Sequence, residues 1–321
     1  MEEISENTVS KDSFDPSDSP KETVSCPSDI VISDVDGLLE EGEEVILQDS
    51  KDRRYLVTLK AGKTFHSHSG VVEHDMIIGL PDASYVKARY NENSKNEERK
   101  YLAIRPTLAD VVLKMPRGAQ VIYPKDLGAI IVSADIYPGA RVLESGVGSG
   151  ALSMTLLRAG ANLVGYELRE DFIEVAKNNI TKYSKHIFGR HIDQEELFAG
   201  TGLKKSGSEI SLSIQHRDIY QGIDERGLDR IVLDLPEPWR VLPFAKDALK
   251  KGGIFLCYLP TINQTATFRS ALKDNGFILA QTFEVLHRSW HIEGQSVRPD
   301  HRMVAHTGFI TTARLLNTNQ M

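Results

Sequence analysis

Hydrophobic and polar positions follow two different patterns along this chain, and the pattern changes near residue 105. Before it, short apolar runs are separated by turn signals such as Ala61-Gly62 and Pro81-Asp82. They predict a small antiparallel β domain over residues 29–104. Its expected strands are Glu44–Leu47, Tyr55–Leu59, Lys63–His66 and Tyr85–Lys87, with a charged loop at Asn91–Lys100.

Beyond residue 105, strand-like runs alternate with helix-like runs. The expected helices are Leu108–Met115, Lys125–Val132, Ala151–Ala159, Arg169–Tyr183 and two near 240–250 and 263–275. The expected strands are Asn162–Tyr166, Ile210–Gln215, Arg230–Leu233, Ile254–Leu259, Gln281–Leu286 and one near Thr307–Leu315. This alternation predicts a parallel sheet with helices on both faces, closed by an antiparallel pair of strands. The polar stretch 184–209 shows no clear pattern.

Charge divides the chain in a second way. Residues 1–50 contain 15 acidic side chains and only two lysines, whereas the other 271 residues contain 36 basic and 30 acidic ones. Residues 1–28 have too little apolar content to order themselves, which predicts a disordered acidic tail. The mildly basic body is compatible with a polyanionic partner, although many enzymes with other substrates share this balance.

Cysteine content and hydropathy exclude several classes of protein. Cys26 and Cys257 are too few and too far apart in sequence for a disulfide framework or a metal cluster. We therefore expect no metal and a reducing, cytoplasmic location. No run approaches the roughly 18–20 apolar residues of a membrane span, and the first residues show no secretory pattern, so no membrane partner is expected.

The strongest chemical signal is R-V-L-E-S-G-V-G-S-G-A at Arg141–Ala151. An apolar strand ends in a carboxylate, and three glycines then alternate before a helix-forming run. Glycine lets the backbone pass close to a ligand, and a strand, glycine loop and helix together form a nucleotide cradle. The candidate cofactor residues are Glu144, Gly146, Val147, Gly148, Ser149 and Gly150.

The glycine spacing alone leaves the ligand open. Gly146-x-Gly148-x-x-Ala151 also fits dinucleotide binding, and a packing loop without a ligand is the plain alternative. However, the carboxylate of Glu144 would repel a pyrophosphate. It suits the ammonium and sulfonium groups of S-adenosylmethionine, which we expect as the cofactor. Glu167, at the end of the next strand, is expected to hold the ribose hydroxyls.

Two later strands also end in candidate residues. Arg217 and Asp218 follow the third strand, where an acid commonly meets the adenine amine of this cofactor, and a capping role for Asp218 is the alternative. The segment Asp234–Trp239, D-L-P-E-P-W, follows the fourth strand. Ligands of open α/β sheets lie beyond the carboxyl ends of strands, so we expect Asp234 to face the methyl donor.

The chemistry of Asp234–Trp239 suits a nucleic-acid base. Its two prolines stiffen the backbone, Trp239 offers a stacking face, and the Asp234 carboxylate is an acceptor for an exocyclic amine. A proline turn with a capping Asp is the alternative. Near the end of the chain, basic and aromatic residues interleave in a way that suits phosphate contact and base stacking. The predicted RNA-contacting residues there are Arg288, Trp290, Arg298, Arg302 and His306.

Together these segments resemble the tRNA (adenine-58-N1)-methyltransferase family over about residues 105–315. The resemblance is carried by R-P-T-L (Arg105–Leu108), Q-V-I-Y-P-K-D (Gln120–Asp126), E-S-G-V-G-S-G-A-L-S (Glu144–Ser153), D-L-P-E-P-W (Asp234–Trp239) and R-P-D-H-R-M-V-A-H-T-G-F (Arg298–Phe309). Many methyltransferases share the glycine loop, whereas the Tyr-Pro-Lys-Asp and Asp-x-x-x-Pro-Trp pieces are far more specific. Val147 stands where Thr is common, and the acidic tail and the long 184–209 stretch are not typical of the family.

The resemblance implies an α/β, Rossmann-like class I methyltransferase domain over residues 105–321, with a seven-stranded, mostly parallel sheet. It implies methyl transfer from S-adenosylmethionine to N1 of adenosine 58 in the tRNA T-loop, and a homotetramer like the actinobacterial and archaeal enzymes. Asp234 would be the catalytic acid residue, Tyr123 would lie beside the base, and Ala119 and Gln120 would line the cofactor site. The alternatives are a methyltransferase for proteins or small molecules, a non-catalytic tRNA-binding subunit and a dehydrogenase.

Overall fold

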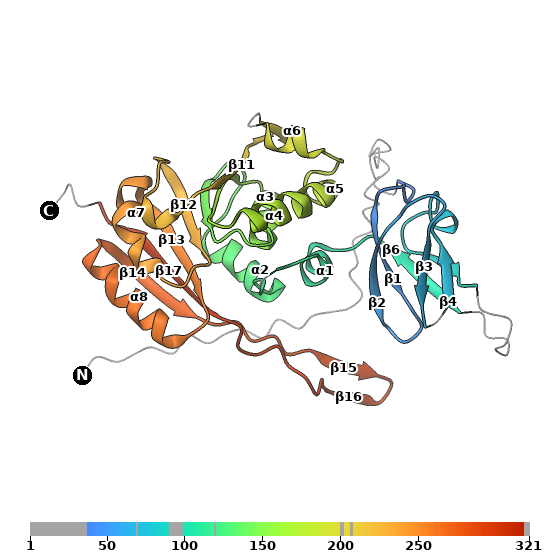
Figure 1. The fold of residues 1–321 in the computed structure, drawn as a ribbon. Coiled ribbons are helices and arrows are strands. Elements are labelled where there is room, and N and C mark those ends of the chain that lie inside the picture. Colours follow the sequence, from blue (N-terminus) through green and yellow to red (C-terminus); the bar gives the residue numbers. More distant parts are fainter. Residues whose placement is uncertain are drawn as a thin grey trace, which may run out of the picture. The chain divides into compact units, whose positions relative to one another are not determined.

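The computed structural model describes residues 37–68, 70–89, 99–118, 120–199, 202–205 and 208–317 (Figure 1). The predicted tail, residues 1–28, lies outside them, as does most of the predicted charged loop at Asn91–Lys100. No helix in these described ranges is long and apolar enough to cross a membrane.

The first described part of the chain is antiparallel β structure with its own core around Val45, Leu47 and Tyr101. Its four-stranded sheet has the order β2-β1-β6-β5 and consists of β1 (Glu44–Gln48), β2 (Arg54–Thr58), β5 (Ser84–Lys87) and β6 (Lys100–Ile104). A separate pair joins β3 (Thr64–Ser67) to β4 (Gly70–Glu73). The four predicted strands are present. The sequence pattern does not predict β4, which begins with a glycine, or β6, which follows a charged stretch. The domain boundary at residues 104/105 remains a prediction.

The second part is built on a seven-stranded sheet of order β11-β8-β7-β12-β13-β17-β14. Its strands are β7 (Arg141–Ser145), β8 (Asn162–Glu167), β11 (Leu212–His216), β12 (Leu228–Leu233), β13 (Leu249–Leu259), β14 (Phe277–Phe283) and β17 (Phe309–Leu315). The first five strands in chain order are parallel, and β17 runs antiparallel between β13 and β14. This confirms the predicted mostly parallel sheet and its antiparallel closing pair.

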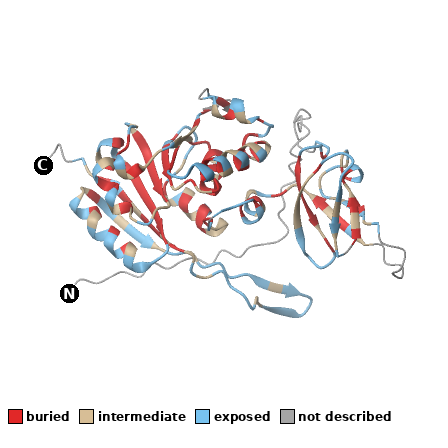
Figure 2. Ribbon diagram, viewed as in Figure 1, coloured by how far each residue is buried: buried red, intermediate tan, exposed pale blue. Residues whose placement is uncertain are grey.

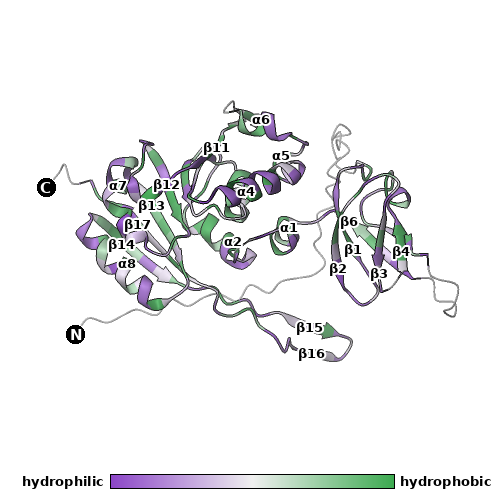
Figure 3. Cartoon of the chain, in the orientation of Figure 1, coloured by the Kyte–Doolittle hydropathy of each residue, from purple (hydrophilic) through white to green (hydrophobic). Residues whose placement is uncertain are grey.

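Helices cover both faces of this sheet because successive side chains of a strand point to opposite faces. On one face, Val142 and Val232 pack in a core with α1 (Leu108–Lys114), α2 (Pro124–Ser133), α3 (Ala151–Arg158) and α5 (Ser184–Phe188). On the other, Leu143 and Leu233 pack with α7 (Leu242–Ala248) and α8 (Ile262–Asp274). The central strands are consequently buried (Figure 2) and largely apolar (Figure 3).

Two regions depart from the sequence-based expectation. Residues 184–209, which show no clear pattern, contain α5, α6 (Gln194–Phe198) and a hairpin of β9 (Leu203–Lys205) and β10 (Ser208–Ile210), which follow α4 (Glu170–Lys182). These helices are too short to produce a recognisable apolar period. The strand expected at Gln281–Leu286 begins earlier, at Phe277, because a bulge between Ile278 and Gln281 interrupts its alternation.

A long excursion separates β14 from β17. We call residues 284–308 the arm; it contains the hairpin of β15 (Trp290–Glu293) and β16 (Ser296–Pro299). The hairpin projects away from the sheet (Figure 1), and Trp290, Ile292 and Val297 on it are exposed. The sequence indicated chemistry in this region but not a pair of strands, since its apolar residues are few and widely spaced.

Candidate active site

A tight glycine loop joins β7 to α3. Gly146, Gly148 and Gly150 have φ angles of +85°, +54° and +83°, a region that residues with a Cβ rarely adopt. A Cβ on Gly146 would lie only 2.2 Å from the backbone oxygen of Asp234. Glycine is therefore required where the ends of β7 and β12 meet.

Glu144 lies beneath this loop and is fully buried. Its Oε2 accepts a hydrogen bond of 2.7 Å from Ser153 Oγ of α3, whereas its Oε1 has no partner within the described part of the chain. Burial raises the pKa of Glu144 to about 8, because water is excluded; the Ser153 bond opposes the rise, and the Asp234 and Glu167 carboxylates add to it. A buried carboxylate oxygen without a donor fits a cationic ligand.

The carboxylate of Glu167 ties the glycine loop to β8. Its Oε2 accepts a hydrogen bond of 3.0 Å from Gly148 N, and its Oε1 accepts one of 3.0 Å from Arg169 N. β8 pairs directly with β7, so this buried side chain reaches the loop from the neighbouring strand end. Each oxygen keeps a second lone pair, which leaves the carboxylate able to accept hydrogen bonds from ligand hydroxyls.

The end of β12 completes a cleft. Asp234 N donates to Ser145 O at 3.0 Å, which continues the pairing of β12 with β7 beyond Leu233. The cleft is lined by Gln120, Val121, Ile122, Gly146, Val147, Gly148, Ser149, Ala151, Leu152 and Asp234. Burial in this narrow place raises the pKa of Asp234 to about 7. The fold thus brings together three segments that the sequence assigns to one site, although Ala119 lies outside the described residues.

Five predicted cofactor residues are not among those that line the cleft: Glu144, Gly150, Glu167, Arg217 and Asp218. Arg217 and Asp218 make local contacts instead. Asp218 accepts hydrogen bonds from Tyr220 N at 2.9 Å and from Gln221 Nε2 at 3.3 Å, at the start of a 3-10 turn. This is the capping geometry that stood as the alternative for Asp218. Arg217 pairs with Asp224 and stacks near a tyrosine ring. The cofactor roles of both residues remain predictions.

The predicted substrate residues occupy two regions. Tyr123 is the N-cap of α2 and directly follows the cleft-lining Ile122, whereas Trp239 lies in a half-buried 3-10 turn after Asp234. The others belong to the arm, where Arg288, Trp290, Arg298 and Arg302 are exposed. The ring of His306 contacts Glu284 Oε2 at 2.9 Å and Pro260 O at 3.0 Å.

Two polar residues of this neighbourhood are absent from the sequence-based site. Ser153 supplies the donor to Glu144, and its only signal is a hydroxyl on an otherwise apolar helix face. Tyr258 lies near the end of β13 and donates a hydrogen bond of 3.4 Å to Asp126 Oδ2. Burial raises the pKa of the Tyr258 hydroxyl, and Asp126 and Asp234 are among the charges that raise it further.

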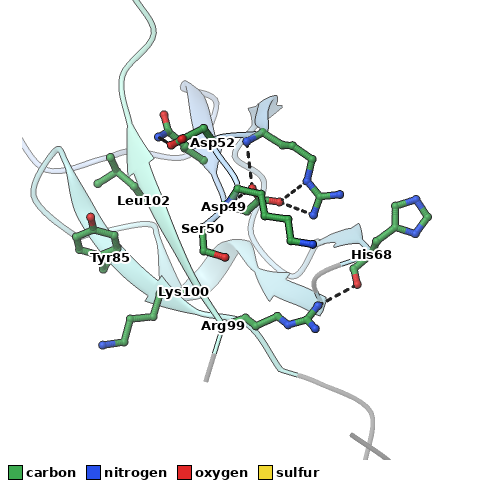
Figure 4. Close-up of a pocket in the computed structure, with 11 residues that line it drawn as sticks. Asp49, Ser50, Asp52, His68, Tyr85, Arg99, Lys100 and Leu102 are labelled. Atoms are coloured by element: carbon green, nitrogen blue, oxygen red, sulfur yellow. Dashed lines mark hydrogen bonds and ion pairs between the residues drawn. The ribbon is translucent and has the colours of Figure 1, made fainter. Parts of the chain in front are cut away.

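A second hollow, larger than the cleft, lies in the N-terminal β part of the described residues. This pocket has a volume of about 860 Å³. It is lined by β1, the turn that follows it, and the β5–β6 pair (Figure 4). Asp49 accepts a hydrogen bond of 2.7 Å from Arg53 Nε there, and Arg99 donates to the backbone oxygen of His68 at 3.3 Å. Because no strand end of the seven-stranded sheet contributes to it, this cavity is separate from the candidate active site.

The sheet order and the site at its strand ends define a class I methyltransferase that uses S-adenosylmethionine. The family model described as "tRNA methyltransferase complex GCD14 subunit" matches residues 101–300, and "TrmI-like N-terminal" matches residues 37–86. The chain therefore belongs to the tRNA (adenine-58-N1)-methyltransferase family, as the sequence motifs predicted.

Individual relatives agree with this assignment. The tRNA (adenine(57)-N(1)/adenine(58)-N(1))-methyltransferase TrmI of Methanocaldococcus jannaschii is 34% identical over 283 residues, which cover 84% of this chain and 94% of that protein. The crystal structure of TrmI from Aquifex aeolicus has a TM-score of 0.70 at 26% identity and covers 88% of this chain and all of that one. A crystal structure from Thermotoga maritima, described as a SAM-dependent O-methyltransferase, has a TM-score of 0.75 at 29% identity, covering 88% and 96%.

The contact between Gly146 and the Asp234 backbone leads to a stability prediction. Gly146→Ala should destabilise the fold by at least about 1 kcal/mol, because alanine is strained at positive φ and its Cβ would clash with a backbone oxygen. Gly128→Ala, at an open position within α2, is the matched control and should be neutral or stabilising by up to about 1 kcal/mol. Urea unfolding of both variants measures the difference. Equal stability would contradict the contact.

Proposed function

We propose that this chain transfers a methyl group from S-adenosylmethionine to N1 of adenosine 58 in tRNA. The observation that carries the proposal is the position of Asp234, which lies at the end of β12 directly against the glycine loop that ends β7. A carboxylate beside the methyl donor suits an acceptor that carries an exocyclic amine and becomes positively charged. Adenine methylated at N1 meets both conditions.

The cofactor site is assigned to residues at the ends of β7 and β8. Oε1 of Glu144, which has no partner among the described residues, would neutralise a cationic group, and Glu167 would accept hydrogen bonds from ribose hydroxyls. Gln120 and the loop residues 146–149 would surround the remaining atoms, with Gly150 providing the turn into α3. When bound, S-adenosylmethionine supplies an electrophilic methyl carbon attached to a positively charged sulfur.

Asp234 and two aromatic residues would act on the acceptor base. The lone pair of adenine N1 forms the new N–C bond while the S–C bond breaks, and the base gains a positive charge. The ionised Asp234 carboxylate would accept a hydrogen bond from the exocyclic amine and stabilise that charge as it develops. The target adenosine must leave its stack, which costs a few kcal/mol, and we assign Tyr123 and Trp239 to hold it.

Asp234→Asn tests the catalytic assignment. The variant should bind S-adenosylmethionine as the wild type does but lose about 100- to 1000-fold in methyl transfer, because the amide carries no charge. For the wild type, the rate should fall as the pH drops below about 7, since protonation removes the same charge. Nucleoside mass spectrometry of unmodified tRNA incubated with enzyme and cofactor measures both.

Asp247→Asn, at an exposed position on α7, is the control for Asp234→Asn and should be fully active. The Thermotoga maritima relative, described as an O-methyltransferase, favours one alternative, which is methyl transfer to another class of acceptor. Wild-type enzyme that methylated a protein or small-molecule extract but left tRNA unmodified would overturn the proposal. Mapping the modified nucleoside also decides whether adenosine 57 is methylated, as the name of the Methanocaldococcus jannaschii enzyme states for that protein.

Cofactor binding should release a proton from Glu144. With its pKa raised to about 8, this carboxyl is mostly protonated at pH 7 in the ligand-free protein. A cationic ligand favours the ionised form, so affinity should rise as the pH rises toward about 8, where the group loses its proton without a ligand. Calorimetric titrations in two buffers of different ionisation enthalpy count the released protons.

Glu144→Gln should bind the cofactor more weakly and release fewer protons than the wild type. Glu170→Gln, a change at an exposed carboxylate in the first turn of α4, should leave the proton count unaltered. An equal count in wild type and Glu144→Gln would show that Glu144 does not face the cationic ligand.

The arm is proposed to contact RNA in a homotetramer. Its candidate residues combine positive charge with aromatic faces, and all five are exposed: Arg288, Trp290, Arg298, Arg302 and His306. The tetramer rests on the resemblance to homo-oligomeric relatives. Because the substrate is tRNA, we also propose a cytoplasmic enzyme, and cell fractionation tests that location.

Arg298→Ala should weaken tRNA binding and lower the slope of log K against log salt by about one phosphate contact. Arg298→Lys keeps the charge and should retain most of the slope. Light scattering of both variants should give the mass of four chains, because the change removes an exposed charge and not an apolar contact. An unchanged salt slope for Arg298→Ala would remove this residue from the RNA-contacting set.

A further inference from the structure

A buried ion pair lies at the first turn of α2, close to the proposed acceptor site. The Lys125 side chain is 6% exposed and that of Asp126 is fully buried. Lys125 Nζ donates to Asp126 Oδ1 at 2.8 Å, to Val285 O at 2.6 Å and to Thr307 Oγ1 at 2.5 Å. All three protons of the ammonium group therefore have acceptors.

Thr307 closes these contacts into a ring. Its Oγ1 accepts from Lys125 and donates to Asp126 Oδ2 at 2.6 Å, so each of the three side chains contacts the other two. Val285 and Thr307 belong to the two legs of the arm, one on each side of its hairpin. The ring thus fastens both legs of the arm to the start of α2.

The same ring reaches Tyr258. The Tyr258 hydroxyl donates to Asp126 Oδ2 at 3.4 Å, and its ring packs tightly against the arm, since a Cβ on Gly308 would lie 2.3 Å from Tyr258 Cζ. Tyr123 is the N-cap of the helix turn that holds Lys125 and Asp126. The same buried polar contacts therefore include the Tyr258 hydroxyl directly and hold the helix turn that begins at Tyr123.

Stability alone gives no reason for such a ring. A cation in the first turn of a helix opposes the helix dipole, and a buried ion pair is often no more stable than an apolar replacement of similar size. What the ring provides is a defined geometry, because directional bonds specify one arrangement of α2, β13 and the arm legs.

We propose that Lys125, Asp126 and Thr307 form a positioning cluster for the acceptor base. The cluster holds Tyr123 and Tyr258 in place around the Asp234 pocket and fixes the arm to the same point, so that RNA held by the arm presents its adenosine in register with Asp234. None of the three side chains takes part in the chemical step. This inference rests on the proposed function, which makes a base of tRNA the acceptor.

Thr307→Val tests the cluster with the smallest change. Valine keeps the shape and removes the hydroxyl, so the ring opens while Lys125 and Asp126 still contact each other. We expect about a 10- to 100-fold lower single-turnover rate at saturating tRNA and cofactor, with both dissociation constants within about twofold of wild type. Thr307→Ser restores the hydroxyl and should restore the rate.

Thr282→Val is the matched control. Thr282 Oγ1 lies 2.8 Å from Thr311 Oγ1 across β14 and β17, so this variant also loses a threonine hydrogen bond in the same part of the sheet, but outside the ring. It should lose less than twofold in rate. Thermal unfolding of all three variants identifies any loss that comes from a less stable fold.

A fluorescent base distinguishes a misplaced acceptor base from a loss of activity that has another structural cause. With 2-aminopurine in place of adenosine 58, wild-type enzyme should raise the emission as the base leaves its stack, and Thr307→Val should reduce that rise. If wild-type enzyme methylates tRNA while Thr307→Val matches it in rate and emission, the positioning role is wrong and the proposed function stands. If wild-type enzyme does not methylate tRNA, the proposed function itself fails.

Discussion

The close approach of two parallel strand ends is the constraint on which the rest of the site depends. β7 and β12 are neighbours in the sheet, and their pairing continues to the hydrogen bond between Asp234 N and Ser145 O. At that point the backbone of Asp234 leaves no room for a Cβ on Gly146. The glycine, the turn that it permits and the placement of a carboxylate against the loop are thus consequences of one backbone contact.

Three carboxylates at neighbouring strand ends give this place its electrostatic character. Glu144 lies on β7, Glu167 ends β8, and Asp234 directly follows β12. The pKa values of Glu144 and Asp234 rise mainly because burial removes water from them. The oxygens of Glu167 already accept hydrogen bonds from two backbone N–H groups. Mutual repulsion adds to the rise at Glu144. A positively charged ligand stabilises the ionised carboxylates against both the loss of water and their mutual repulsion. A pyrophosphate would add further repulsion. The same arrangement that favours S-adenosylmethionine therefore disfavours the dinucleotide that the glycine spacing alone allows.

Much of this architecture follows from local sequence, and the exceptions have physical causes. The glycine loop and the alternation of strands and helices are encoded within a few residues, so they are predictable. The donor to Glu144 is not, since Ser153 reaches it only after α3 folds back on β7. Lys125 and Asp126 belong to a recognisable motif, yet their partner Thr307 is 181 residues from Asp126 and comes close only through the insertion of β17 between β13 and β14. The capping contacts of Asp218 show the converse, because a local bond satisfies a side chain that strand order alone assigns to a ligand.

The arm has a buried end and an exposed end, and different interactions dominate at each. Where the arm joins the sheet, the hydrogen bonds among Lys125, Asp126 and Thr307 are shielded from water. The shielding strengthens each bond, and their directions specify one geometry. At its hairpin, Trp290 and Arg298 are exposed, where salt screens charge and side chains move readily. Such a division would suit the proposed contact with tRNA, because the exposed hairpin could meet the RNA in many encounters while the buried end of the arm would hold one orientation at the cleft. An enzyme whose acceptor was a small molecule would need the buried contacts where the arm joins the sheet. It would have no use for an exposed hairpin with positively charged and aromatic side chains.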